Sequence, residues 1–132
     1  MLEYEPKIVI AFAETLTGNK DILEWLTKNG YPELAALSIC MRGNDDGFKW
    51  LMANGYPHLG AFDRAADNNV DALLWLVRHD YKIYAILAEA CNKKPRAISY
   101  LRENDLLALM HVVNNFNIHR ESMIFNPYKK PF

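Results

Sequence analysis

Residues 43–57 read GNDDGFKWLMANGYP, and the same pattern recurs along the chain every 25 residues. Residues 18–32 read GNKDILEWLTKNGYP, and looser copies follow at residues 68–82 and 93–107. One large aromatic residue marks the centre of each copy: Trp25, Trp50, Trp75 and Tyr100. A fixed period of about 20–50 residues indicates a stack of structural repeats, so this period predicts the fold.

The composition indicates one globular domain. The chain has 132 residues, of which 51% are hydrophobic, enough for a buried core and too many for a disordered chain. Its formal net charge is -1, from 15 basic and 16 acidic residues, so we expect neither nucleic acid nor an anionic membrane as a partner. No apolar run reaches the ~18 residues of a membrane span. Residues 1–5 contain two glutamates and no basic residue, whereas a secretory signal begins with a basic segment.

Both ends of the first helix in each repeat can be predicted from single residues. Asn19 can act as an N-cap, because its side chain can accept a hydrogen bond from a backbone N–H of the first turn. In the fourth repeat Pro95 stands at the first helical position, where proline is tolerated best. Gly30 and Gly55 stand where a helix ends in a left-handed residue, and Asp80 takes that place in the third repeat.

The second helix of each repeat is almost wholly apolar and therefore needs cover on several sides, which stacked neighbours would supply. One large apolar residue per repeat should fill the same layer of the core: Phe12, Leu37, Phe62, Leu87 and Val112. We expect nine helices, at 6–16, 20–29, 32–42, 45–54, 57–67, 70–79, 82–91, 95–103 and 106–116. The expected fold is an all-α, right-handed solenoid of about four helix-turn-helix repeats, because each unit contacts mainly its neighbours.

The expected organisation is a single repeat domain over residues 1–116, followed by a C-terminal tail at 117–132. The repeat units are predicted at 18–42, 43–67, 68–92 and 93–117. The last helix has no further repeat to cover it, so the tail, a second copy of the chain or a partner should cover its outer face. We expect Met123, Ile124 and Phe125 to pack on it as a cap, with residues 129–132 mobile. The four regularly spaced aromatic residues are expected in the core, where large aromatic side chains contribute most to stability.

Two stretches resemble an ankyrin helix pair: RAADNNVDALLWL at residues 64–76 and MRGNDDGFKWLMANG at residues 41–55. The resemblance covers roughly residues 8–106 and implies an ankyrin-like array. The period of 25 is shorter than the ankyrin period of about 33, and the Thr-Pro-Leu-His opening is missing. The missing residues correspond to the projecting β-hairpin of that family. The resemblance therefore implies a finger-less array, and ankyrin-like arrays bind proteins. Leucine-rich-variant repeats are a weaker match.

The sequence shows little sign of a catalytic, metal-binding or cofactor-binding site. Its four histidines occupy unrelated positions in the repeat, Cys40 and Cys91 are not in a CxxC pair, and no glycine-rich phosphate loop occurs, so we expect no metal and no cofactor. Both cysteines lie in apolar runs, which predicts buried, reduced thiols and a cytoplasmic protein.

Charged residues that share a repeat position could instead line a polar groove along the apolar helices, or could form an ordinary solvated ladder of ion pairs. The candidate partner-binding residues are Glu14, Arg42, Asp63, Arg64, Asp67 and Glu89, with Tyr128 and Phe132 in the tail.

Two function classes remain open. The first is a non-enzymatic protein–protein interaction module, either a monomer or a weak homodimer through its C-terminal end. The second is an enzyme or small-ligand-binding protein with a site in a groove between the helix layers. A pair of ionisable groups with strongly perturbed pKa values in a deep pocket would favour the second class.

Overall fold

The computed structural model describes residues 1–125, and every regular element in that part of the chain is an α-helix. The helices are α1 (Pro6–Thr15), α2 (Lys20–Lys28), α3 (Pro32–Met41), α4 (Asp45–Ala53), α5 (Pro57–Ala66), α6 (Val70–Arg78), α7 (Lys82–Cys91), α8 (Pro95–Glu103) and α9 (Leu107–Phe125). The all-α repeat fold is confirmed. The predicted end of the last helix at residue 116 is wrong, because α9 continues to Phe125.

The turns have the geometry that the sequence predicts. The side chain of Asn19 accepts a hydrogen bond from the backbone N–H of Ile22, 3.1 Å away, at the start of α2. At the end of the same helix Gly30 has a φ of +92°, and the N–H of Tyr31 donates to the carbonyl of Leu26 at 2.9 Å. This is the Schellman ending, which turns the chain sharply into the next helix.

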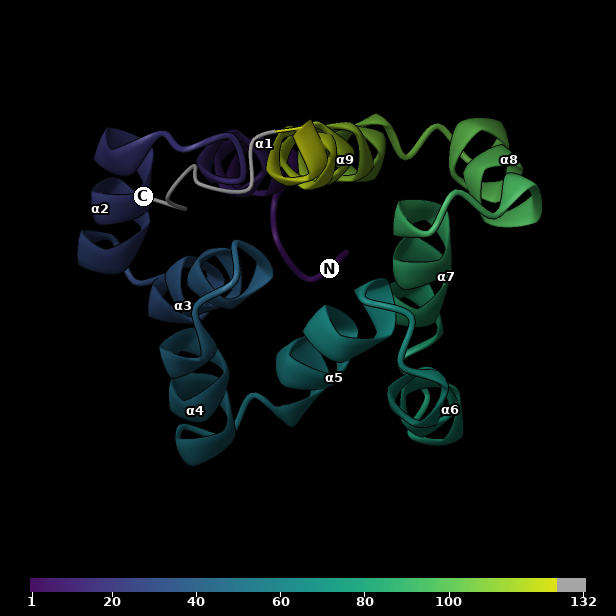
Figure 1. Ribbon diagram of the computed structural model, residues 1–132, viewed down its shortest axis with the longest axis horizontal. Coiled ribbons are helices and arrows are strands. Elements are labelled where there is room, and N and C mark those ends of the chain that lie inside the picture. The colour runs from purple at the N-terminus through teal and green to yellow at the C-terminus, as the bar shows by residue number, and fades with distance from the viewer. Residues whose placement is uncertain (126–132) are drawn as a thin grey trace.

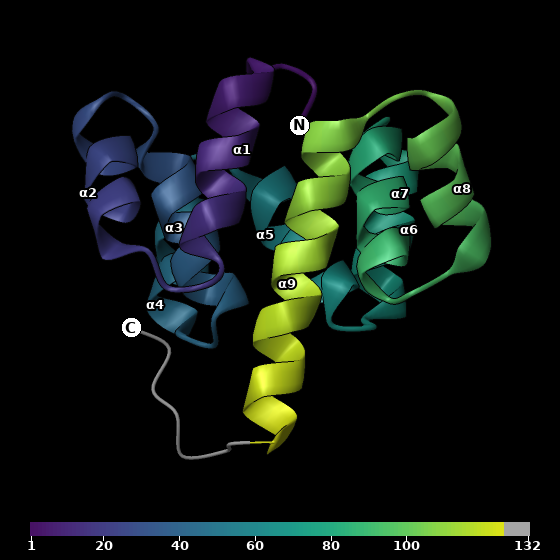
Figure 2. The same ribbon diagram turned by 90° about the horizontal axis from the view of Figure 1, so that it is seen from above.

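The helices form two concentric layers (Figure 1). The helices α1, α3, α5, α7 and α9 surround the centre, and α2, α4, α6 and α8 pack around them. The inner layer is closed, because α1 packs along α9 (Figure 2). The expectation that the last helix lacks a neighbour is therefore wrong: the first helix of the chain occupies the place of the next repeat.

The core lies inside this ring of five helices. Each inner helix contributes one large apolar side chain at the same repeat position, and all five are completely buried: Phe12, Leu37, Phe62, Leu87 and Val112. The layer predicted from the 25-residue period is confirmed. The side chain of Met1 is also fully buried, and the N-terminal segment enters the middle of the ring (Figure 1).

Specific polar contacts connect α1 and α9 at the seam, which is the contact between the first and last helices of the ring. The amide of Asn115 on α9 donates to the carbonyl of Ala13 on α1 at 2.9 Å, and both groups are buried. Glu14 on α1 and His111 on α9 form a second side-chain contact across the same seam. Polar contacts between α1 and α9 therefore close the ring together with apolar packing.

Two arginines bind the carbonyl ends of the inner helices. Arg42 donates to the carbonyl of Leu16 at the end of α1, and Arg120 donates to the carbonyls of Ala66 and Cys91 at the ends of α5 and α7. The last turn of a helix has unpaired carbonyls and a partial negative charge, so a guanidinium stabilises it. The extension of α9 beyond residue 116 places Arg120 at this position.

Candidate interaction surface

The regularly spaced residues Trp25, Trp50, Trp75 and Tyr100, here called the aromatic ladder, lie on the outer helices and not in the core. The exposed fraction is 45% for Trp25, 36% for Trp50 and 42% for Tyr100, and Trp75 is half-buried. The prediction of a buried ladder is wrong. The next residue in each helix is the buried one, since Leu26, Leu51, Leu76 and Leu101 are all fully inaccessible.

Each tryptophan of the ladder stacks on the tyrosine of the turn that follows it. The ring centroids are 6.4 Å apart for Trp25 and Tyr31, 6.0 Å for Trp50 and Tyr56, and 5.8 Å for Trp75 and Tyr81. The interplanar angles are 16°, 13° and 6°, so the rings are nearly parallel. The Schellman turn causes this arrangement, because it folds the residue after the left-handed position back against the end of its own helix. Each indole is thus in contact with the end of its own helix, and Trp75 also stacks on His79, with ring centroids 4.1 Å apart.

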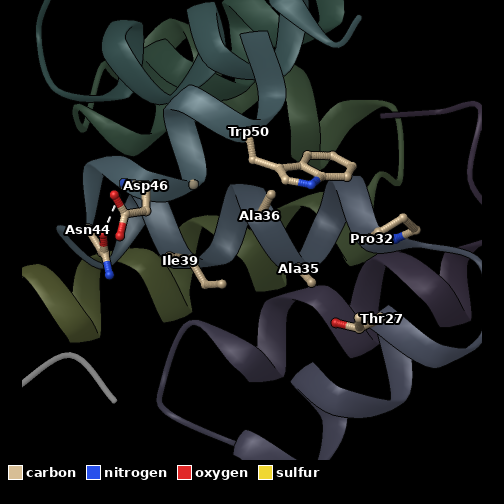
Figure 3. Close-up of a pocket in the computed structure, with 9 residues that line it drawn as sticks. Thr27, Pro32, Ala35, Ala36, Ile39, Asn44, Asp46 and Trp50 are labelled. Atoms are coloured by element: carbon tan, nitrogen blue, oxygen red, sulfur yellow. Dashed lines mark hydrogen bonds between the residues drawn. The ribbon is translucent and has the colours of Figure 1, made fainter. Parts of the chain in front are cut away.

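The closed ring leaves grooves between the outer helices. The outer helices lie on a wider circle than the inner ones, and each packs on inner helices instead of on the next outer helix. The first groove lies between α2 and α4 over α3, and its cavity measures about 390 Å³ (Figure 3). Trp50 forms one wall, Ala36 and Ile39 line the surface of α3 in the groove, and Asn44 and Asp46 stand at one end.

A second groove lies one repeat further along, between α4 and α6 over α5, and measures about 430 Å³. Eight lining positions of the first groove recur in it after 25 residues, and the pairs are Thr27 and Met52, Pro32 and Pro57, Ala36 and Ala61, Ile39 and Arg64, Asn44 and Asn69, Asp46 and Asp71, Gly47 and Ala72, and Trp50 and Trp75. The two grooves are therefore copies of one surface, and we call them the first and second grooves.

Within the described part of the chain, the two grooves carry unpaired acidic side chains and one paired basic side chain. Asp46 and Asp71 are exposed carboxylates in the first turn of α4 and α6, and neither forms an ion pair with any residue of 1–125. Arg64 of the second groove is already engaged. Its guanidinium lies 3.2 Å from Asp45 and 3.7 Å from Asp63, and it stands over the ring of Phe48 at 3.9 Å from the centroid.

The charged candidates from the sequence do not form one polar groove. Glu14 lies at the seam with His111, and Glu89 lines a small cavity with Lys94 beside α6. Asp63 is buried next to Arg64.

Arg42 and Asp67 line a cavity of about 330 Å³ at the C-terminal end of the inner helices, together with Phe116, Arg120 and Met123. Met123 is half-buried there, as a residue of α9 and not of a separate tail. Tyr128, Phe132 and residues 129–132 lie outside the described residues.

Shifted pKa values occur in the N-terminal segment and among the packed helices. Burial lowers the pKa of the Met1 amino group from 8.0 to about 6 and raises that of Tyr4, and both residues line a cavity of about 260 Å³ beside the start of α9. Burial raises the pKa of Asp63 from 3.8 to about 6, although the charge of Arg64 opposes that rise. Burial and the nearby Asp63 also raise the pKa of the Cys40 thiol. Both cysteines are buried free thiols, as the sequence predicts. Asp63 and Cys40 are not among the residues that line the two grooves.

In residues 1–125 no cluster of three potential metal ligands occurs, and none of the helices there is both long and apolar enough to cross a membrane. Comparisons with protein-family models, with curated proteins and with solved structures find no match to this chain, so the resemblance to ankyrin repeats has no support beyond the helical repeat fold itself.

Proposed function

We propose that the chain is a non-enzymatic protein–protein interaction module, a finger-less ankyrin-like array that binds a cytoplasmic protein partner along its aromatic ladder. The observation that carries this proposal is the repetition of one groove, with a partly exposed tryptophan as its wall, at two successive positions. Tryptophan and tyrosine are the residues on which protein interfaces depend most, especially when they are fixed in place before binding. The tyrosine behind each indole supplies that fixation.

Closure of the ring supports the outer face as the binding surface. An open solenoid offers its concave side to a partner. Here the corresponding side chains of the inner helices, such as Phe62 and Leu87, fill the interior of the ring and are fully buried. The outer helices carry exposed apolar side chains, including Met52, Leu74 and Val77, although the inner helices α1 and α9 also expose Ile10, Leu107 and Ile118. Exposed apolar side chains that lie close together are typical of interaction surfaces.

Photo-crosslinking in cells of the source organism tests this proposal. A photoreactive amino acid replaces Met52, which lines the second groove and is 49% exposed, or Ile118, which is 55% exposed on α9 and serves as the matched control. We expect a discrete crosslinked partner from position 52 that is lost with Trp50→Ala and Trp75→Ala, and none of that size from position 118. Equal crosslinking from both positions, or a product that the tryptophan substitutions do not change, would contradict the proposal.

The alternative class, an enzyme or a small-ligand-binding protein, needs ionisable groups that converge in a cavity. The buried pair of Asp63 and Cys40 has perturbed pKa values but lines neither groove. Met1 and Tyr4 also have shifted pKa values and line a separate cavity, but the amino group of Met1 is paired with Glu3 and the hydroxyl of Tyr4 donates to Glu33. The interaction module is therefore the function that the surface favours.

A further inference from the structure

We propose that the two grooves bind a segment of the partner protein that carries two basic side chains, each beside an apolar side chain. This inference rests on the proposed interaction function and adds the chemistry of the partner. Each groove would take one apolar side chain against its tryptophan and one lysine or arginine at its acidic end. Because the second groove repeats the first, one segment could supply both pairs.

The apolar half of each groove is built to accept a side chain. In the first groove Trp50, Pro32 and Ala36 line the same cavity (Figure 3). The small residues on α3 leave room above that helix in this part of the groove, since larger side chains would fill it. In the second groove Trp75, Pro57 and Ala61 take the same places, and Met52 adds apolar surface. An apolar side chain seated there would remove exposed indole surface from water.

The acidic half of each groove suits a cation. Asp46 and Asp71 stand four residues before the tryptophan in the same helix, so carboxylate and indole lie on the same side of that helix. Neither carboxylate has an ion-pair partner in residues 1–125. A lysine or arginine of the partner could pair with the carboxylate and also contact the indole, whose face attracts cations.

The helix ends do not favour an anion in the same place. A helix N-terminus attracts anions through its free N–H groups. In the first groove the side chain of Asn44 already accepts from the N–H of Asp46 at 2.9 Å, and in the second groove Asn69 accepts from the N–H of Ala72 at 3.0 Å. These caps, together with the adjacent carboxylates, leave a cation as the better match.

The fourth repeat marks where this surface ends. In the fourth repeat the positions of the asparagine, the aspartate and the tryptophan are occupied by Lys94, which precedes α8, and by Arg96 and Tyr100 on α8. The sign of the charge is therefore reversed there, although the aromatic character is kept. Arg96 is exposed and lies in the first turn of its helix, so it provides a matched control position for the two aspartates.

Selection from a random peptide display library on the intact chain tests the inference. We expect enriched peptides with lysine or arginine next to apolar residues. A selected peptide, labelled and measured by fluorescence anisotropy, should bind the double variant Asp46→Lys, Asp71→Lys at least about fivefold more weakly, as expected for the loss of two exposed ion pairs. Binding to Arg96→Glu should stay within about twofold of the unchanged chain. Far-UV circular dichroism of each variant checks that the helices are intact.

Three results would overturn the inference. The first is enrichment of acidic or uncharged peptides, the second is binding that the aspartate substitutions do not weaken, and the third is no enrichment at all. If the peptides depend on Trp50 and Trp75 but not on the aspartates, the charge preference fails while the interaction function stands. If position 52 also gives no tryptophan-dependent crosslink, the interaction function fails as well.

Discussion

At the scale of single residues, Gly47 decides how closely two helices approach. A Cβ atom at this position would lie 2.3 Å from the carbonyl oxygen of Ala36 and 2.8 Å from the backbone nitrogen of Cys40. Both atoms belong to the backbone of α3, so they cannot move away as a side chain can. The glycine therefore allows α4 to pack directly on α3, and it lines the first groove.

Gly47→Ala should lower the free energy of unfolding by about 1–3 kcal/mol, because the new methyl group must push α3 and α4 apart. Gly60→Ala is the matched control. The atoms nearest to its Cβ would be side-chain atoms of Met52 and Phe48 at 3.1 Å, which can shift, so the loss should be smaller. Urea denaturation of both variants measures the difference. Equal losses at the two positions would contradict the close backbone approach at Gly47.

Asp63 should make the stability of the protein depend on pH. Burial raises its pKa in the folded state from 3.8 to about 6, so folding favours the protonated form. The stability that goes with this proton is complete below about pH 4 and is lost as the pH rises through about 6. Asp63→Asn should therefore increase the free energy of unfolding by up to about 3 kcal/mol at neutral pH and change it little near pH 4.

The measurement is urea denaturation of the wild-type chain and Asp63→Asn at the two pH values. Other groups also titrate in this range, including His58, whose pKa is lowered by burial. The difference between the two proteins removes those contributions. A gain in stability of the same size at both pH values would show that the charge of Asp63 is not its cause.

At the level of the helix, two adjacent large residues of each outer helix have different surroundings. The leucine after each ladder residue faces the inner layer and is fully buried, while the ladder residue itself stays partly exposed, and the three tryptophans stack on the tyrosine of the following turn. The 25-residue period locates both residues in every repeat. Periodicity does not show which of two adjacent apolar residues faces the core.

Trp50→Ala should lower the free energy of unfolding by only about 1–2 kcal/mol, because the indole is 36% exposed and loses mainly its stacking on Tyr56. The adjacent Leu51→Ala should cost about 2–5 kcal/mol, as truncation of a fully buried leucine does. Chemical denaturation followed by circular dichroism compares the two variants without relying on tryptophan fluorescence. A larger loss for Trp50→Ala than for Leu51→Ala would place the indole in the core after all.

At the scale of the whole molecule, closure of the ring removes the free ends that a repeat array otherwise has. In an open array each repeat depends mainly on its neighbours, and the terminal repeats fray first. Here α1 and α9 cover each other, and Arg120 of α9 bonds to the ends of α5 and α7. We expect the protein to unfold as one cooperative unit.

Phe12→Ala on α1 should lower the global free energy of unfolding by about 3–5 kcal/mol. If the ring is one cooperative unit, the amide protons of α5, on another side of the ring, should lose protection against hydrogen exchange to the same extent as those of α9. Phe62→Ala in α5 is the control and should give the same pattern. Loss of protection confined to α1, α2 and α9 would instead indicate an array whose ends unfold independently.

The local features of this protein follow from short stretches of its sequence. Asparagine caps, the prolines at helix starts and the left-handed turn residues act within a few positions of the chain, so the starts of eight helices agree with those predicted. The buried layer that includes Phe62 and Leu87 also follows from the repeat alone.

The surroundings of each helix depend on packing between segments that lie far apart in the sequence. Curvature accumulates from the packing of every repeat on the next, and no single residue encodes it. The structure therefore decided that α1 meets α9, that α9 continues to Phe125, and that the outer helices stand apart over open grooves. The same curvature places the aromatic ladder at the surface, because a side chain on the wide side of a closed ring has no neighbouring helix to cover it.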